Sequence, residues 1–104
     1  MNIGCVIYKK DFNDGTLKAD WQFIINNQQV QGTGIAKGKP GKNYEGNYTI
    51  VYIDSEGNKS KEYDLRITII DNIYHLKWYE NNCLKYVGTG MMYEDVLVAG
   101  WRIS

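Results

Sequence analysis

Few side chains in this 104-residue chain could do acid–base or nucleophilic chemistry, and their spacing keeps them apart. His75 is the single histidine, and the alternation of polar and apolar residues around it places it on the outward face of a strand. No second histidine or inward carboxylate accompanies it, so neither a zinc site nor a catalytic triad can be assembled. Cys83 lies at a turn with no base beside it to activate its thiol. We therefore expect a protein that is not an enzyme and that needs no metal or cofactor.

The residues that do suggest a site are aromatic. Rings that carry a hydroxyl or an indole N–H and face an apolar interior are typical of small-ligand pockets. The alternation predicts that one inward face carries eight such side chains, which are our candidate ligand-binding residues: Trp21, Tyr48, Tyr52, Tyr63, Tyr74, Trp78, Tyr86 and Trp101. Tyr48, Tyr52 and Tyr63 are the expected polar contacts to a small amphipathic or aromatic molecule. The alternative is that these rings fill the interior and contact only each other.

The elements that must position these rings are predicted to be strands. Runs of alternating apolar and polar residues recur along the chain and are separated by short turns rich in Asn, Asp and Gly, which is typical of a β-meander. We expect an all-β fold, an eight-stranded antiparallel up-and-down barrel of calycin-like type, with residues 1–104 forming one domain. The run MMYEDVLVAG (residues 91–100) also has near-helical spacing, so a short helix there stays open as an alternative.

The turns set the expected register of the strands. Asn26-Asn27 and Asp71-Asn72 are predicted to be two-residue turns, and the first of them pairs Trp21 with Gly32. Asp14-Gly15 is likewise predicted to be a two-residue turn, which pairs Lys9 with Asp20 and leaves Lys10 pointing inward near the barrel rim.

The turn at Asn81 needs one more residue, because a two-residue turn in a regular ladder would place Lys85 inside the barrel. We expect a three-residue loop from Asn81 to Cys83, which pairs Trp78 with Tyr86.

A Gly-Thr-Gly motif occurs twice, at residues 32–34 and 88–90, and each copy follows an Asn-Asn turn and a strand that carries a tryptophan. Glycine within a strand permits sharp curvature, and a large ring packed over it covers the exposed backbone. We expect Trp21 and Trp101 to pack over these glycines. Eight strands that curl in this way close with an interior that holds side chains or one small ligand.

The spacing of aromatic and glycine residues forms a series: Gly46-x-Tyr48-x-Ile50-x-Tyr52, Tyr74-x-Leu76-x-Trp78, Tyr86-x-Gly88-Thr-Gly90 and Leu97-x-x-Gly100-Trp101. This series resembles small bacterial barrels of unassigned function, which are similar to the calycin group of lipocalin, fatty-acid-binding and avidin-type barrels. The resemblance covers residues 46–101, with GTLKADW (residues 15–21) as a further match, and it implies a calycin-like fold. This chain lacks the lipocalin Gly-x-Trp near the N-terminus and the avidin ligand set. The resemblance therefore assigns no site residue.

Charge and hydropathy exclude several classes of partner. Twelve basic and twelve acidic residues cancel, and no basic stripe of the kind that binds nucleic acid stands out. No apolar segment of about 18 residues is present, so we expect no membrane span. The first residues, MNIGCVIYKKDFND, lack the features of a signal peptide. We expect a cytoplasmic protein in which Cys5 and Cys83 are free thiols.

The outward faces are more apolar than a solitary barrel requires. The outward aliphatic and aromatic positions are Ile24, Ile35, Val51, Ile53, Ile70, Ile73, Tyr79, Val87, Val96 and Val98. Contiguous apolar patches usually mark contacts with another protein. The alternative function is therefore a homo-oligomeric interaction module with a filled barrel, and we expect a homodimer or a docked protein partner on the fourth, fifth and eighth strands.

Overall fold

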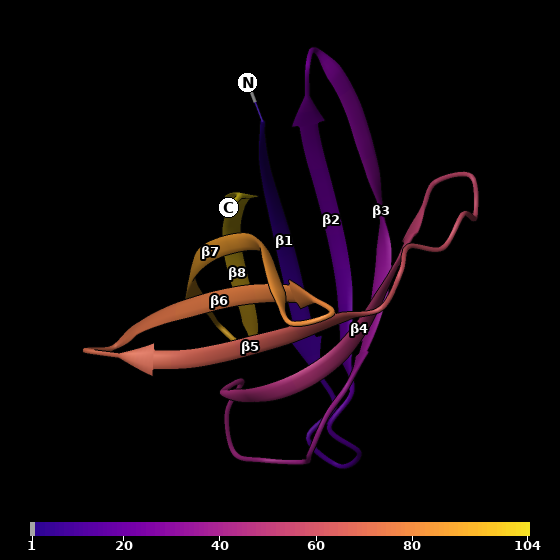
Figure 1. Ribbon diagram of the computed structural model, residues 1–104. Helices are drawn as coiled ribbons and strands as arrows, with labels where there is room; N and C mark the ends of the chain where they lie inside the picture. The colour runs from indigo at the N-terminus through magenta and orange to yellow at the C-terminus, as the bar shows by residue number, and fades with distance from the viewer. Residues whose placement is uncertain (1) are drawn as a thin grey trace.

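The computed structural model describes residues 2–104, which form a closed antiparallel barrel in which every strand pairs with its neighbours in the sequence (Figure 1). The last strand pairs with the first and closes the barrel. The predicted fold class is therefore confirmed over these residues. The strands are β1 (Ile3–Lys10), β2 (Leu17–Ile25), β3 (Gln28–Lys37), β4 (Gly46–Asp54), β5 (Tyr63–Ile70), β6 (Ile73–Glu80), β7 (Cys83–Tyr93) and β8 (Val96–Ile103).

The alternative of a helix over residues 91–100 is wrong. These residues form the end of β7, a turn and the first half of β8, with Met92 opposite Leu97. Their apolar side chains fit a strand because alternate residues of β8, Leu97 and Ala99, are buried in the barrel. No helix that could cross a membrane occurs in the part of the chain that the structure describes.

Alternating burial along the strands builds the core. In β1 every second residue is buried and the residues between them are exposed, as expected for a strand with one face toward the interior. The buried apolar side chains are Val6, Tyr8, Leu17, Ala19, Ala36, Tyr44, Tyr48, Ile50, Leu65, Ile67, Leu76, Trp78, Leu97 and Ala99. Six further rings pack against this core and are only partly buried: Trp21, Tyr52, Tyr63, Tyr74, Tyr86 and Trp101. All eight predicted aromatic residues thus face the interior.

Asparagine and aspartate determine three of the hairpins. Both residues of the Asn26-Asn27 and Asp71-Asn72 turns have positive φ, which the twist of a two-residue hairpin requires and which Asn and Asp tolerate. The predicted pairing of Trp21 with Gly32 is confirmed. Across the second of these hairpins, Leu65 lies opposite Trp78.

The predicted register of the first hairpin is wrong by two residues. Lys9 lies opposite Lys18, and Asp20 lies opposite Ile7. The connection is longer than Asp14-Gly15 because two aspartates hold a wider loop. The Asp14 carboxylate accepts hydrogen bonds from the Thr16 backbone N–H (2.9 Å) and hydroxyl (2.7 Å).

The first loop also includes Asp11, whose backbone N–H donates to the Thr16 carbonyl at 2.9 Å. Its carboxylate accepts a hydrogen bond from the backbone N–H of Asn13 at 2.8 Å. The side chain of Lys10 points inward, as predicted.

The expected three-residue loop after β6 is wrong, although the pairing that it was meant to preserve is confirmed. Asn81 and Asn82 both have positive φ and form a two-residue turn, with Glu80 opposite Cys83. The register then shifts between Trp78 and Tyr79, so that Trp78 still lies opposite Tyr86. A β-bulge in β7 therefore absorbs the extra residue that the sequence pattern assigned to the loop.

Close backbone approach explains the glycines in β3 and β7. A side chain at Gly32 would collide with the Ile53 carbonyl, and one at Gly88 would collide with the Gly100 carbonyl. Trp101 lies opposite Gly88, as predicted. Trp21 lies opposite Gly32, and its indole N–H donates to the Thr33 carbonyl at 2.7 Å. The absence of a side chain at these two glycines lets the sheet curl sharply, and the rings of Trp21 and Trp101 cover the backbone there.

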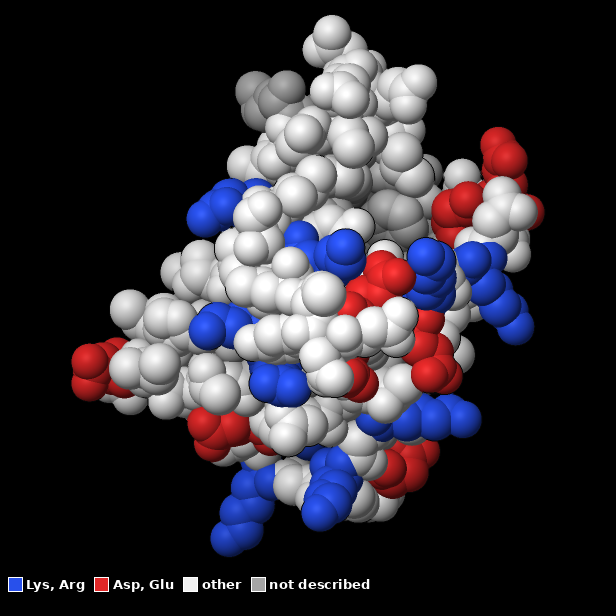
Figure 2. Space-filling view, in the orientation of Figure 1, with Lys and Arg blue, Asp and Glu red and all other residues white. Residues whose placement is uncertain are grey.

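Charged side chains of both signs are interspersed over the lower part of the face in Figure 2, whereas the projecting end of the β2–β3 hairpin at the top is uncharged. Residues 21–36 contain no Lys, Arg, Asp or Glu. The charge therefore gathers around the body of the barrel and leaves the end of the β2–β3 hairpin without charged side chains.

Candidate functional site

A cavity of about 160 Å³ lies inside the barrel at the end where the two termini lie (Figure 1). We call this the open end. Every strand except β3 contributes at least one lining residue, and β7 contributes Tyr86 next to its bulge. The lining residues are Val6, Trp21, Phe23, Tyr52, Ser60, Tyr63, Trp78, Tyr86 and Trp101.

Five of the lining rings contact one another in a closed circuit, which we call the aromatic circuit. Ring centroids are 6.3 Å apart for Tyr52 and Tyr63, 5.8 Å for Tyr63 and Tyr86, and 5.2 Å for Tyr86 and Trp101. Trp101 lies 6.3 Å from Trp78. The indole N–H of Trp78 closes the circuit by donating to the Tyr52 hydroxyl at 2.6 Å. The cavity is thus enclosed by rings that support one another.

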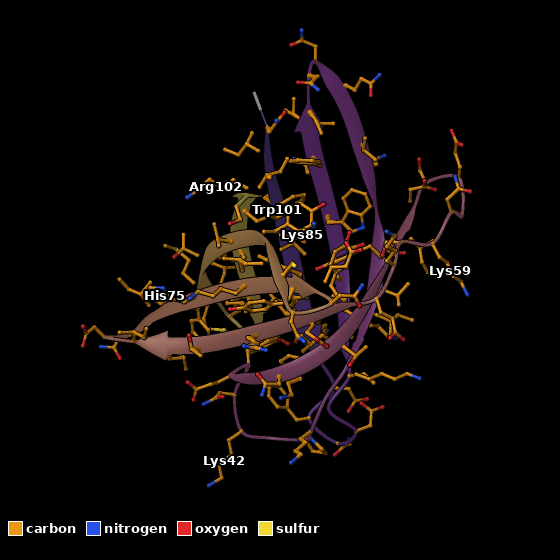
Figure 3. The ribbon with its side chains drawn as sticks, in the orientation of Figure 1. Lys42, Lys59, His75, Lys85, Trp101 and Arg102 are labelled. Atoms are coloured by element: carbon orange, nitrogen blue, oxygen red, sulfur yellow. The ribbon has the colours of Figure 1, made fainter. Side chains whose placement is uncertain are left out.

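Outside the circuit, two further rings extend the wall toward β2. Trp21 contacts Tyr52 edge to face at 6.1 Å, and Phe23 stacks on Trp101 at 4.2 Å. In Figure 3, Trp101 lies at the upper end of the barrel between β8 and β2, whereas Lys42 and Lys59 project away from it.

The deepest polar groups of the cavity already have partners. The Tyr52 hydroxyl bonds to the Tyr8 hydroxyl at 2.6 Å, in addition to accepting from Trp78. The Ser60 hydroxyl donates to the Lys61 carbonyl at 2.7 Å and accepts from the Tyr52 backbone N–H at 2.9 Å. The floor of the cavity therefore presents apolar ring surface and few free hydrogen-bonding groups.

The outer polar groups are different. Within residues 2–104, the hydroxyls of Tyr63 and Tyr86 and the indole N–H of Trp101 make no well-formed hydrogen bond to the protein, although the Tyr86 hydroxyl is close enough to that of Tyr63 to help raise the pKa of Tyr63. All three side chains are half-buried. They are the groups that solvent or a ligand can reach.

Burial keeps the phenols of Tyr52 and Tyr63 in the cavity wall, and of Tyr8 behind it, in their neutral form. Burial raises the pKa of Tyr63 to about 12, and burial raises the pKa of Tyr8 and Tyr52 further above the usual value of 10.0. No Asp, Glu, Lys, Arg or His lies among the lining residues that the structure describes. The cavity wall consequently carries no formal charge.

The opposite end of the barrel is closed by polar contacts around Lys10, which is only 5% exposed. Its ammonium group donates to the Asn43 carbonyl at 2.9 Å and to the Tyr48 hydroxyl at 3.0 Å. The Tyr48 hydroxyl in turn donates to the Tyr44 carbonyl at 2.9 Å. Burial lowers the pKa of Lys10 and raises the pKa of Tyr48 to about 12.

Tyr44 completes this closed end from the segment between β3 and β4. Its hydroxyl accepts a hydrogen bond from the Lys10 backbone N–H at 2.9 Å and donates to the Asp95 carbonyl at 2.6 Å. Phe12 packs edge to face on its ring at 5.8 Å. One side chain thus joins the first loop, the β3–β4 segment and the β7–β8 turn.

The structure divides the predicted site residues between two places. Trp21, Tyr52, Tyr63, Trp78, Tyr86 and Trp101 line the cavity. Tyr48 belongs to the closed end, and Tyr74 is half-buried opposite Ile69 and Gly90, away from the cavity lining.

Three lining residues were not predicted. Val6 and Phe23 lie on the inward faces of β1 and β2, so the alternation could have identified them. Ser60 lies in the loop before β5 and has no such signal in the sequence.

The side chains that could do chemistry lie elsewhere. His75 is half-buried on the outer surface, opposite Thr68 and Thr89, as predicted. Cys5 and Cys83 are both free and exposed. Among the described residues, no three His, Cys, Asp or Glu side chains lie close enough together to hold a metal ion.

Comparison with known proteins adds no relative. No family model, curated protein or solved structure matches this chain. The calycin-like resemblance of the sequence stays a prediction, and the function has to be argued from the cavity and the surface.

Proposed function

We propose that this protein binds a small amphipathic or aromatic molecule in the cavity at the open end of the barrel. The observation that supports this function is the space of about 160 Å³ within the aromatic circuit, in a barrel whose other end is filled by side chains. Packed protein interiors keep few spaces larger than a water molecule, so a space of this size is notable. An apolar cavity of about 150 Å³ is known to accept benzene, so a molecule of that size fits.

The proposed role is binding without catalysis. The lining offers rings, one valine and one serine, and its deepest polar atoms are already paired. Such a wall holds a ligand by apolar contact and orients it with a few hydroxyl or indole groups at the mouth.

Titration with a fragment library, followed by tryptophan fluorescence, tests this function because three tryptophans line the cavity. Saturable quenching or enhancement by at least one fragment is expected. Val6→Phe, which places a ring in the cavity, should abolish the response, and Ile7→Phe on the outer face of the same strand is the matched control. A cavity that no fragment occupies would contradict the function.

A second candidate is self-association, and an outer apolar patch favours it. Across three strands, Ile7 pairs with Val98 and Val98 pairs with Met91, whose side chain is 72% exposed. Tyr93, which is 67% exposed, lies opposite Val96 at the next outward position. The patch thus lies on β1, β8 and β7, and of the predicted strands it includes only the eighth.

The partner that this patch fits best is a second copy of the chain. Its central residues are uncharged, so two copies can meet without repulsion. Lys9 and the acidic Glu94-Asp95 turn border the same end of the patch and can pair across a twofold axis. Light scattering should show a dimer that Met91→Lys dissociates and that Gln31→Lys on β3 leaves intact. A monomer at high concentration would exclude this candidate.

A further inference from the structure

The shape of the aromatic circuit bears on which ligand it takes. Around the circuit, successive ring planes are inclined by 53° (Tyr52 and Tyr63), 68° (Tyr63 and Tyr86), 81° (Tyr86 and Trp101) and 52° (Trp101 and Trp78). Planes that turn by such angles at each step enclose a central space on several sides. A compact, rounded group fits such a space better than a flat one.

A binding slot for a flat ring needs two parallel walls with a gap between them. The stacked pair at this end is Phe23 and Trp101, and their centroids are 4.2 Å apart, so they contact each other and leave no gap. The other contacts within the aromatic circuit are tilted or edge to face. The geometry is therefore unfavourable for sandwiching an aromatic ligand.

The hydrogen-bonding state of the wall restricts the ligand further. A carboxylate or phosphate would lose its hydration without gaining a cation, because the lining residues carry none. A primary ammonium would need acceptors in the floor, where the Tyr52 and Ser60 oxygens are already engaged. An ammonium whose hydrogens are replaced by methyl groups needs no hydrogen-bond acceptor and no protein cation, because the negative faces of aromatic rings hold it.

One carboxylate lies at the edge of this site. Glu80, at the end of β6, is 20% exposed and pairs with Lys61 at 3.2 Å, while Lys61 itself is 77% exposed. Glu80 is near enough to Tyr63 to make a small contribution to the raised pKa of that tyrosine, after burial and the Tyr86 hydroxyl. Because an exposed lysine is a weak partner, the Glu80 carboxylate can still attract a cation at the mouth.

We propose, on the premise that the cavity binds a ligand as argued above, that the buried part of this ligand is a methylated ammonium group enclosed by the aromatic circuit. The rings surround one rounded cation on several sides, and Glu80 supplies a negative charge at the edge of the site. The rest of such a ligand extends past Tyr63, Tyr86 and Trp101 into solvent.

Three probes of matched size test the proposal on the unmodified protein: tetramethylammonium, tert-butanol and phenol. Tetramethylammonium and tert-butanol have similar shapes but differ in charge, whereas phenol is flat and neutral. We expect tetramethylammonium to bind at least about tenfold more tightly than tert-butanol, in a titration followed by tryptophan fluorescence and by the NMR signals of the indole N–H groups.

The possible results separate the two proposals. Equal affinity for tetramethylammonium and tert-butanol, or tighter binding of phenol, would overturn the methylated ammonium while leaving ligand binding in place. If neither these probes nor any library fragment binds, the proposed function falls as well.

Variants give an independent check. Tyr86→Leu removes one wall of the circuit and should weaken tetramethylammonium binding about tenfold or more, whereas Tyr74→Leu, an inward tyrosine away from the lining, should not. Because either tyrosine change can destabilise the fold, Glu80→Gln serves as a gentler variant. It should weaken tetramethylammonium about threefold and leave tert-butanol binding unchanged. An unchanged tetramethylammonium affinity in both Tyr86→Leu and Glu80→Gln would refute the proposal.

Discussion

The two ends of the barrel use the same kind of residue for opposite purposes. At the closed end, the hydroxyls of Tyr44 and Tyr48 both have protein partners and are joined to a buried lysine. At the open end, the hydroxyls of Tyr63 and Tyr86 make no well-formed hydrogen bond within residues 2–104 and have each other as a polar neighbour, and their rings border a space. All four tyrosines face inward, but the hydroxyls at the closed end are bonded to the protein, whereas the two at the open end are left accessible to the ligand proposed above.

Alkaline pH destabilises both ends alike, and we expect it to have the largest effect on the free energy of unfolding. Burial raises the pKa of Tyr48 and of Tyr63 to about 12, and it raises those of Tyr8 and Tyr52 as well. Because the folded pKa values exceed the unfolded value of 10.0, this stability is fully present below pH 10 and is lost as the pH rises toward 12. We expect a loss of several kcal/mol, at up to about 1.4 kcal/mol per pH unit for each tyrosine.

Chemical denaturation as a function of pH measures this loss. The lowered pKa of Lys10 acts in the opposite direction, since its neutral form is favoured in the fold and stability rises as the pH approaches 10.5. Lys10→Met should remove that rise and keep the loss above pH 10. Constant stability from pH 9 to pH 12 would contradict the burial of the phenols.

Replacing a glycine by alanine should destabilise the protein much more at the open end than at the closed end. Gly88→Ala at the open end places a methyl group against the Gly100 carbonyl and 3.2 Å from atoms of Trp101 and Trp78. We expect it to cost about 3 kcal/mol in the free energy of unfolding. Gly41→Ala at the closed end meets only the Lys10 ammonium at 3.8 Å and should change stability by less than about 0.5 kcal/mol. Urea unfolding compares the two variants, and equal costs would show that the curl does not depend on Gly88.

Removing one tyrosine hydroxyl from each end gives two matched variants whose stabilities can be compared. Tyr44→Phe leaves the Lys10 backbone N–H without an acceptor inside the protein, so it should cost about 1–3 kcal/mol. Tyr63→Phe removes a hydroxyl without a protein partner and should cost less than about 0.5 kcal/mol. Thermal unfolding of both variants under one condition measures the difference. A larger cost for Tyr63→Phe would reverse the roles assigned to the two ends.

The ion pair at the mouth should matter least. Lys61 and Glu80 are 3.2 Å apart, but Lys61 is 77% exposed and free to move into solvent. Lys61→Met should therefore change the free energy of unfolding by less than about 0.5 kcal/mol. The same variant should strengthen tetramethylammonium binding slightly, since the carboxylate loses its competing cation. Isothermal titration in low salt measures this effect, and weaker binding would show that Lys61 is not a competitor.

Turn residues and alternation made most of the fold predictable. Pairs of Asn and Asp at positive φ determined the hairpins at Asn26 and Asp71, and the inward face followed from a period of two. The first hairpin was not predictable in the same way, because Asp11 and Asp14 use their side chains to hold a wider loop. The bulge in β7 was missed because a two-residue turn plus a bulge preserves the same pairing as a longer loop.

The candidate site was predictable in kind but not in extent. The sequence pattern placed the rings on one face, yet it could not divide them between two ends. That division depends on contacts between distant segments, such as Tyr44 with Asp95 and Tyr52 with Trp78. Whether a void remains among inward rings depends on their rotamers, which no local pattern specifies.

The seam of the barrel joins its first and last strands, and Gly4 on β1 lies opposite Trp101 on β8, with the indole directly over the glycine. A chain emerging from the ribosome cannot complete the aromatic circuit until β8 has been synthesised. Pairing across almost the whole length of the polypeptide is entropically slow, so we expect the cavity to be completed late in folding. A nascent or C-terminally clipped chain that lacks β8 consequently lacks the complete cavity, however well its earlier hairpins have formed.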